Sequence, residues 1–186
     1  MRLHKKFPKL ELFLREDLTA SLAGRLAAGL LDAALIAFPY DIPGVEVIDI
    51  CEDRFWFVCN PDHPFANKKS LTPENLRAHK LLLLEDGHCL REHAIDACEV
   101  AERTGITNFD GTSLFTLTQM VRTGLGATLL PDMAVKTGLA KSAGLNAIPF
   151  KKPAPARRIG IAWRRGSGRG EEARAIAEMV GDLLAA

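Results

Sequence analysis

The feature that most constrains the fold of this chain is an alternation of strand-like and helix-like segments along its whole length. Short apolar and β-branched runs predict strands, and apolar residues at helical spacing predict helices. Strands are expected at residues 10–14, 32–38, 45–50, 54–59, 81–84, 107–109, 127–130, 145–149 and 158–163. Helices are expected at 18–28, 87–103, 113–122 and 169–186, with short ones after Thr72 and from Pro131. This alternation is typical of an α/β fold with largely parallel sheets.

The composition is that of an ordinary soluble globular protein. The chain has 186 residues, 47% hydrophobic and 25% charged, which suffice for one domain or two small lobes. A net charge of +1 gives no general reason to expect binding to nucleic acid or membranes. The longest apolar run, residues 26–38, is broken by Gly29 and Asp32 and is too short to span a bilayer. No signal sequence opens the chain, so we expect a cytoplasmic protein whose cysteines stay reduced.

Two segments have the composition of joints between lobes. One is the acidic stretch 49–53, and the other is the Pro- and Lys-rich stretch 150–156. A chain that leaves one lobe at the first joint and returns at the second would form two α/β lobes. A small ligand would then bind in the cleft between them.

The spacing of Cys89 and Cys98 is the most informative feature for function. Within one helix, nine residues correspond to a rise of about 13.5 Å and a rotation of about 900°. A disulfide needs its two Cα atoms within roughly 7 Å of each other. If these cysteines bond, the helix between them has to come apart, so the pair is a candidate redox switch. The alternative is that both are merely small buried side chains, which the spacing alone does not exclude.

The two cysteines differ in their expected surroundings. If Asp86 caps the helix, Cys89 falls in the first turn, where free N–H groups and the helix dipole favour a thiolate. His88, Arg91 and His93 add possible cationic partners, whereas Asp86 and Glu92 oppose a thiolate. Cys98 lacks such neighbours and is interpreted as a resolving thiol. Attack of Cys89 on a peroxide would give a sulfenic acid with which Cys98 could condense.

Other chemistry fits the sequence less well. Cys89, His93 and His88 could contribute to a zinc site, but no second Cys/His pair stands at finger-like spacing. There is no Cys-x-x-Cys motif, and the residues around Ser113 form no nucleophile elbow. The basic residues between 151 and 169 are interpreted as a solvated edge.

The residues around Cys89 resemble the sensing segment of the OxyR proteins, the peroxide-responsive members of the LysR-type transcriptional regulators. The resemblance rests on the motif Glu85-Asp-Gly-His-Cys-Leu-Arg91 followed by Cys98. It extends over nearly the whole chain, through residues 7–11, 30–36, 62–67, 112–114, 120–121, 124–131 and 157–161. General LysR-type effector domains share the architecture but not the cysteine pair.

This resemblance implies a two-lobed regulatory domain similar to type 2 periplasmic binding proteins. Lobe I would comprise residues 1–51 and 159–186, and lobe II residues 52–158. The family's winged helix-turn-helix is missing, and so is the first strand of lobe I, which carries a second pocket threonine. Ala97 and Glu99 replace the aromatic neighbours that some members place around the resolving cysteine.

The resemblance also implies the roles of individual residues. Cys89 matches the peroxide-reactive cysteine, and Cys98 matches its resolving partner. The peroxide pocket would be formed by Thr19, Gly87, His88 and Leu90, with Arg91 in support. The hydroxyl of Thr19 would help to hold the peroxide.

The expected partners follow from the same family. They are hydrogen peroxide and further copies of the chain, with DNA and RNA polymerase engaged only through the full-length protein. The output would be activation of antioxidant genes. No cofactor, metal or membrane is expected, and the protein is not expected to be an enzyme. The alternatives are a LysR-type domain that binds a small organic effector, a thiol peroxidase-like enzyme using the same pair, and a zinc-binding module.

Overall fold

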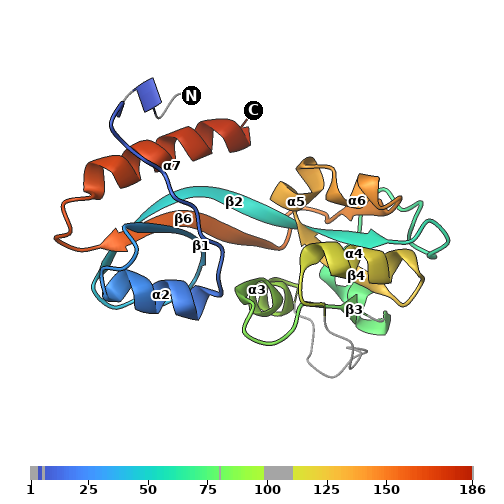
Figure 1. Ribbon diagram of the computed structural model, residues 1–186. Coiled ribbons are helices and arrows are strands. Elements are labelled where there is room, and N and C mark those ends of the chain that lie inside the picture. Colours follow the sequence, from blue (N-terminus) through green and yellow to red (C-terminus); the bar gives the residue numbers. More distant parts are fainter. Residues whose placement is uncertain (1–3, 6, 80, 99–110, 186) are drawn as a thin grey trace. The chain divides into compact units, whose positions relative to one another are not determined.

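The chain folds into two compact α/β units, each formed from strands and helices in alternation (Figure 1). The computed structural model describes residues 4–5, 7–79, 81–98 and 111–185. The first unit contains residues 1–52 and 158–186, and the second contains residues 53–157. Two strands, β2 (Val45–Cys59) and β6 (Ala156–Arg164), contribute residues to both units. None of the described helices is both long enough and apolar enough to cross a membrane.

The first unit is a sheet with one helix on each face. Its strand β1 (Ala33–Phe38) pairs antiparallel with β6, and β6 lies between β1 and β2. Alternate residues of β6 point to opposite faces of the sheet. Accordingly, Ala162 packs in one cluster with Leu26 of α2 (Thr19–Ala27), while Ile161 and Trp163 pack against α7 (Gly170–Ala185). Figure 1 shows α2 and α7 on opposite sides of these strands.

The second unit has a larger core built around β2. This strand pairs antiparallel with both β4 (Ala127–Pro131) and β5 (Asn146–Pro149), and β4 pairs in parallel with β3 (Leu81–Leu82). All five residues of β4 are buried, as expected of a strand covered on both faces. The remaining elements are η1 (Pro73–Ala78), α3 (Cys89–Ala97), α4 (Leu114–Arg122), α5 (Asp132–Lys136) and α6 (Leu139–Ser142).

The prediction of largely parallel sheets is wrong for the described strands. The pairs β1–β6, β2–β4 and β2–β5 are antiparallel, and β3–β4 is parallel. An alternation of strands and helices fixes their order along the chain. It does not fix the direction in which segments distant in sequence, such as β1 and β6, pair with each other.

Two of the predicted strand assignments also differ from the structure. Residues 10–14 form no strand, and Leu12, Phe13 and Leu14 are exposed, with Phe13 exposed to 85%. Strand propensity is effective only where a neighbouring strand and a covering layer are present. The segments 45–50 and 54–59, predicted as separate strands, are one continuous strand, β2. The predicted strand at 107–109 lies outside the described residues.

Candidate functional site

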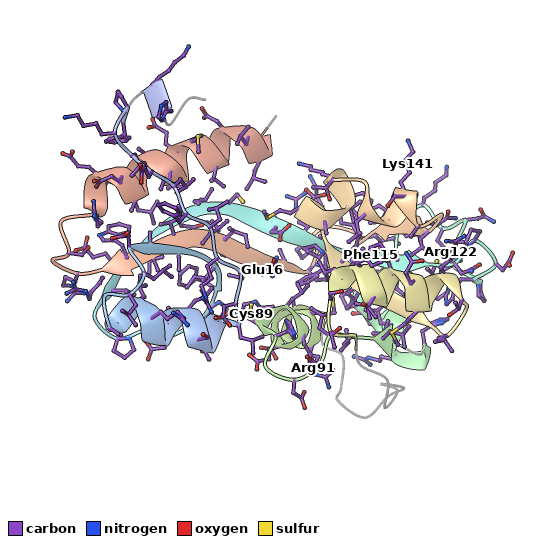
Figure 2. The ribbon with its side chains drawn as sticks, in the orientation of Figure 1. Glu16, Cys89, Arg91, Phe115, Arg122 and Lys141 are labelled. Carbon is purple, nitrogen blue, oxygen red and sulfur yellow. The ribbon has the colours of Figure 1, made fainter. Side chains whose placement is uncertain are left out.

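The two cysteines of the predicted switch lie at opposite ends of one short helix. Cys89 is the first residue of α3 and is half-buried, and Cys98 is its C-cap residue. Nine residues of helix separate their Cα atoms by about 13.5 Å, about twice the roughly 7 Å limit for a disulfide. Both thiols are free. The expected separation of the two cysteines by a helix is therefore present in the reduced protein, and Figure 2 shows Cys89 on α3.

Helix α3 begins later than the sequence predicted. Asp86 does not cap it: Asp86 and Gly87 form a turn, and His88 is the N-cap residue with an extended backbone. Gly87 has a backbone φ of +92°, which residues with a Cβ rarely adopt. Because a right-handed helix needs a negative φ, α3 cannot extend back through this residue. As a consequence, Cys89 lies directly at the N-terminal end of α3. No side-chain oxygen of the N-cap residue satisfies the first N–H groups there.

The helix dipole at this position favours negative charge. The imidazole of His88, the preceding residue, lies with its Nε2 3.8 Å from the Glu85 carboxylate. Glu92 also lies in the first turn of α3 and opposes the dipole.

The side chain of Arg91 links the first turn of α3 to Leu84, the last residue of the preceding buried segment 81–84. Its Nη1 donates a hydrogen bond to the carbonyl oxygen of Leu84 at 3.1 Å, and its Nε lies 2.9 Å from the Asp86 carboxylate. The side chain of Arg91 is only 14% exposed, whereas that of Asp86 is 93% exposed. Leu84 is itself buried and forms a parallel bridge with Gly111. Residues 84–91 are here called the latch loop; they comprise the turn before α3 and the first three residues of α3. The Arg91 side chain links the two ends of this segment.

Cys98 has the surroundings of a core residue. It is 1% exposed and belongs to the hydrophobic core of the second unit, together with Leu90 and Ala94 of the same helix. Burial raises the pKa of the Cys98 thiol to about 12, because desolvation penalises the thiolate. At neutral pH Cys98 is therefore a protonated, shielded thiol. The predicted helix ended at residue 103, but α3 ends at Ala97, and residues 99–103 lie outside the described part.

Thr19 lies in the first unit, at the first position of α2, and is buried. Asp17 organises the start of that helix. Its carboxylate accepts hydrogen bonds from the backbone N–H of Leu18 at 3.0 Å and from the Ser21 hydroxyl at 2.9 Å. These bonds hold the pKa of Asp17 below its ordinary value, first through Ser21 and then through Leu18. Gly87, His88, Leu90 and Arg91 are neighbours of Cys89 along the chain in the second unit. A peroxide pocket formed by them together with Thr19 stays a prediction.

The structure gives no support to a zinc site among the residues it describes. No group of three or more Cys, His, Asp or Glu side chains suited to hold a metal ion occurs in residues 4–5, 7–79, 81–98 and 111–185. Cys89 and His93 are four positions apart on α3, but His93 is buried and Cys89 only half-buried.

A hollow on the second unit lies apart from the cysteine segment. Its volume is about 490 Å³, and its lining combines the end of β2 with the ends of α4 and α6. The lining residues are Asn60, Pro61, Asp62, Arg122, Lys141, Ser142, Ala143 and Gly144. None of the predicted site residues belongs to this set.

The remaining cysteines and two of the histidines also have defined surroundings. Cys59 is fully buried, and burial raises its pKa to about 11, whereas Cys51 is only half-buried. His63 and His79 lie against each other with ring centroids 5.1 Å apart. Phe65 lies 4.2 Å from the ring of His79, also centroid to centroid. Sequence separation hid this cluster, because its members come from different segments of the unit.

The sequence also missed a buried ion pair. Arg157, predicted as part of a solvated basic edge, donates from Nε to the Asp53 carboxylate at 3.0 Å. Asp53 is 1% exposed, and its other oxygen accepts from the backbone N–H of Met133 at 3.0 Å. Asp53 lies in the acidic stretch 49–53, so the local sequence carries no signal that this carboxylate is buried and needs a partner.

Comparison with known proteins identifies the relatives of the chain. The sequence profile of the LysR substrate binding domain matches residues 1–185. A probable hydrogen peroxide-inducible genes activator from Mycobacterium avium is 41% identical over 178 residues, which are 95% of this chain and 57% of that protein. The chain therefore spans a little over half the length of this relative.

Solved structures agree with this result. The regulatory domain of the OxyR2 E204G mutant from Vibrio vulnificus, in a sulfate-bound form, is 38% identical with a TM-score of 0.87. The match covers 98% of this chain and 86% of that one. The C206S mutant of Corynebacterium glutamicum OxyR, described as H2O2-bound, is 32% identical with a TM-score of 0.88. It is matched over 97% of this chain and 57% of that one. The expected type of fold is confirmed by these similarities.

Proposed function

Since the chain belongs to the LysR-type regulators through its LysR substrate binding domain, we propose that it is the peroxide-sensing regulatory domain of an OxyR-like transcription regulator. The observation that carries this proposal is the contrast between the two cysteines of α3. Cys89 is half-buried at the helix N-terminus, whereas Cys98 is shielded in the core at the other end. The hydrogen peroxide named for the relatives is the matching oxidant.

The first step is oxidation of Cys89. Its thiolate attacks one oxygen of hydrogen peroxide, the O–O bond breaks, and an S–O bond forms. Sulfur loses two electrons and becomes a sulfenic acid, while the departing hydroxide takes up a proton to become water. Cys89 is assigned this step because it is half-buried, whereas Cys98 is shielded in the core.

The second step is closure of the disulfide. The Cys98 sulfur attacks the sulfenic sulfur of Cys89, the S–O bond breaks, and a second water leaves with the thiol proton. This attack requires α3 to unwind, because the intact helix holds the two Cα atoms about 13.5 Å apart. Unwinding also takes Cys98 out of the core. The rearranged segment is the local event that would change contacts elsewhere in the regulator.

The peroxide pocket is assigned to the residues predicted from the sequence. Gly87 allows the turn that precedes His88 and Cys89. Leu90, which is buried in the core, would supply an apolar wall of the pocket. The hydroxyl of Thr19 would both donate to and accept from the peroxide oxygens. The relative described as H2O2-bound supports a peroxide pocket in this type of domain.

The remaining parts of the proposal concern the full-length regulator. The units would act as regulatory lobe I, residues 1–51 with 159–186, and lobe II, residues 52–158. A DNA-binding segment in the rest of the protein would contact DNA and RNA polymerase in the cytoplasm. Copies of the chain would associate, so that the disulfide alters the arrangement of their DNA-binding segments. One oxidation per signal suffices, which distinguishes this role from that of a peroxidase.

The test is peptide mapping of the purified chain after one equivalent of hydrogen peroxide. The proposal expects a Cys89–Cys98 disulfide in the wild type. It expects no such bond in Cys89→Ser and a trapped sulfenic acid at Cys89 in Cys98→Ser. Cys59 is the internal control, because it is equally buried but lies on β2 outside the switch segment.

Other results would refute the proposal. If the four thiols react slowly and to the same extent, the cysteines are incidental. If the wild type instead consumes many equivalents of peroxide in the presence of a reductant, the chain is an enzyme. A shift in melting temperature with organic acids, without any disulfide, would indicate a small-molecule effector domain.

A further inference from the structure

The latch loop, residues 84–91, begins at the buried Leu84 and ends in the first turn of α3. It contains Cys89, the proposed peroxide-reactive residue. We propose that Arg91 is a positioning residue that holds α3 wound in the reduced protein and thereby sets how readily Cys98 becomes available. In the sensing reaction this role rests on the proposed function. The latch itself, the hydrogen bond from Arg91 to the Leu84 carbonyl, is present in the reduced chain and is testable without peroxide.

The contact with Leu84 is the stronger of the two that Arg91 makes within the loop. The Leu84 carbonyl belongs to a buried residue, and Arg91 Nη1 donates to it at 3.1 Å. The neighbouring backbone groups are already engaged, since Gly111 N–H donates to Leu83 O and Glu85 N–H donates to Gly111 O, each at 3.1 Å. A charge-assisted hydrogen bond to a shielded carbonyl is worth more than a neutral one, and its loss leaves the carbonyl desolvated.

The contact with Asp86 has a different character. Because the Asp86 side chain is 93% exposed, water screens its attraction to the guanidinium. It orients the planar fork of Arg91 and contributes little to holding the helix. The two contacts therefore make separable predictions, which allows Asp86 to serve as a control.

Unwinding α3 from its N-terminal end requires the hydrogen bond between Arg91 and Leu84 to break. Arg91 lies two residues after Cys89, in the same turn of the helix. Moving Cys89 toward Cys98 by the several ångströms that a disulfide needs displaces this turn from Leu84, to which Arg91 is bonded. A nine-residue helix has little stability of its own in water, so such tertiary contacts decide whether it remains wound.

The other end of α3 is held differently. There Cys98 and Ala94 are buried in the core, and the Cys98 N–H donates to Ala94 O at 3.2 Å. At the Cys89 end, Leu90 also packs in this core, and the hydrogen bond from Arg91 to Leu84 is a restraint that a single substitution removes. Figure 2 shows Arg91 and Cys89 on this helix.

The experiment measures alkylation of each thiol by a maleimide at pH 8, in reduced protein with catalase present to remove peroxide. Arg91→Met removes the donors and keeps the apolar stem. We expect the rate at Cys98 to rise about tenfold or more, the effect of losing a charged hydrogen bond to a buried carbonyl. The rate at Cys59, which is buried in the same unit but is not on α3, should stay unchanged.

Three further variants separate a latch from a general structural effect. Arg91→Lys should restore slow alkylation in part, because lysine keeps the charge and can reach one of the two acceptors. Asp86→Asn should change the rate at Cys98 by no more than a few-fold, as expected for an exposed ion pair. Arg77→Met, which removes an exposed arginine from η1, is the matched control and should have no effect. Arg91→Gln replaces Arg91→Met if the latter does not fold.

An unchanged rate at Cys98 in Arg91→Met overturns the latch. Equal acceleration of Cys98 and Cys59 also overturns it, because the unit as a whole would then have lost stability. In a parallel series with one equivalent of peroxide, the Cys89–Cys98 disulfide should form faster in Arg91→Met than in the wild type. If the wild type forms no disulfide, the proposed function fails while the alkylation rates still decide the latch. Faster alkylation without a faster disulfide would overturn the role of the latch in sensing.

Discussion

The burial of Cys98 predicts that the reduced protein loses stability in alkali through this one thiol. Burial raises the pKa of Cys98 from its ordinary 9.0 to about 12 in the folded protein. Between these two values the unfolded chain has released the thiol proton and the folded chain still holds it. Since the unfolded state then binds fewer protons, the free energy of unfolding falls as the pH rises.

The size of this effect follows from the two pKa values of Cys98. One full pH unit within the window changes the free energy of unfolding by about 1.4 kcal/mol. Between pH 9 and pH 11 the loss due to Cys98 is about 2 kcal/mol, because the unfolded thiol is already half ionised at its ordinary pKa of 9.0. Below pH 8 the contribution is complete and does not change with pH.

The assay is urea unfolding of the wild type and Cys98→Ala at pH 8, 9, 10 and 11 in the presence of a reductant. Lysine and tyrosine side chains titrate in both proteins, so their effect cancels in the difference. Cys98→Ala should be less stable at pH 8, because the sulfur no longer fills the core, but its stability should fall less steeply with pH. Cys59→Ala is the comparison for a second buried thiol, and its smaller increase in pKa, to about 11, predicts a smaller change in slope.

Parallel stability curves for the wild type and Cys98→Ala between pH 9 and pH 11 would refute this reasoning. Such a result would mean that Cys98 ionises as easily in the folded protein as in the unfolded chain. The thiol could not then be shielded, and α3 would have to be open in the reduced state.

Three further perturbations test other parts of the structure. Asp53→Asn should lower the free energy of unfolding by about 3–5 kcal/mol in a urea titration, because it leaves Arg157 charged and nearly buried; Asp49→Asn, in the exposed pair with Arg158, should cost less than about 1 kcal/mol. Burial, together with the neighbouring His79, lowers the pKa of His63, so the unfolded chain binds more protons as the pH falls below about 6.5; stability should decrease there in the wild type and less so in His63→Phe. Gly87→Ala forces a Cβ into a backbone with φ of +92° and should lower stability by about 1 kcal/mol or more, measured by urea, while slowing the reaction of Cys89 with peroxide.

Local signals predicted those elements whose boundaries depend on nearby residues. Helix α4 was predicted at 113–122 and spans Leu114–Arg122, with Ser113 as its cap accepting a hydrogen bond from the Thr116 N–H. The start of η1 followed in the same way from Thr72 and Pro73, which occupy the cap and the first helical position. In both cases the decisive partner lies within a few residues along the chain.

Features that depend on distant partners could not be predicted in this way. The partner of Asp53 is Arg157, at the far end of the second unit's sequence, and no local pattern connects them. The exposed segment 10–14 has the composition of a strand but no described neighbour with which to pair. At the site, the sequence predicted the separation of the cysteines. It did not predict the depth at which Cys98 is buried, because that depth depends on core residues from several other elements.

If Cys89 and Cys98 form the proposed disulfide, the burial of Cys98 and the length of α3 together explain how this bond would act as a switch. A nine-residue helix is too short to persist without its tertiary contacts, and the apolar anchor at its C-terminal end includes the resolving cysteine itself. In the proposed switch, opening of α3 would therefore change the helix and part of the core in a single event. The disulfide would have to compensate for the lost burial of Cys98, which would give the protein two distinct states rather than a continuous range. A thiol placed on the surface of the same helix could be oxidised as well, but its oxidation would leave the core unchanged and would carry no signal beyond α3.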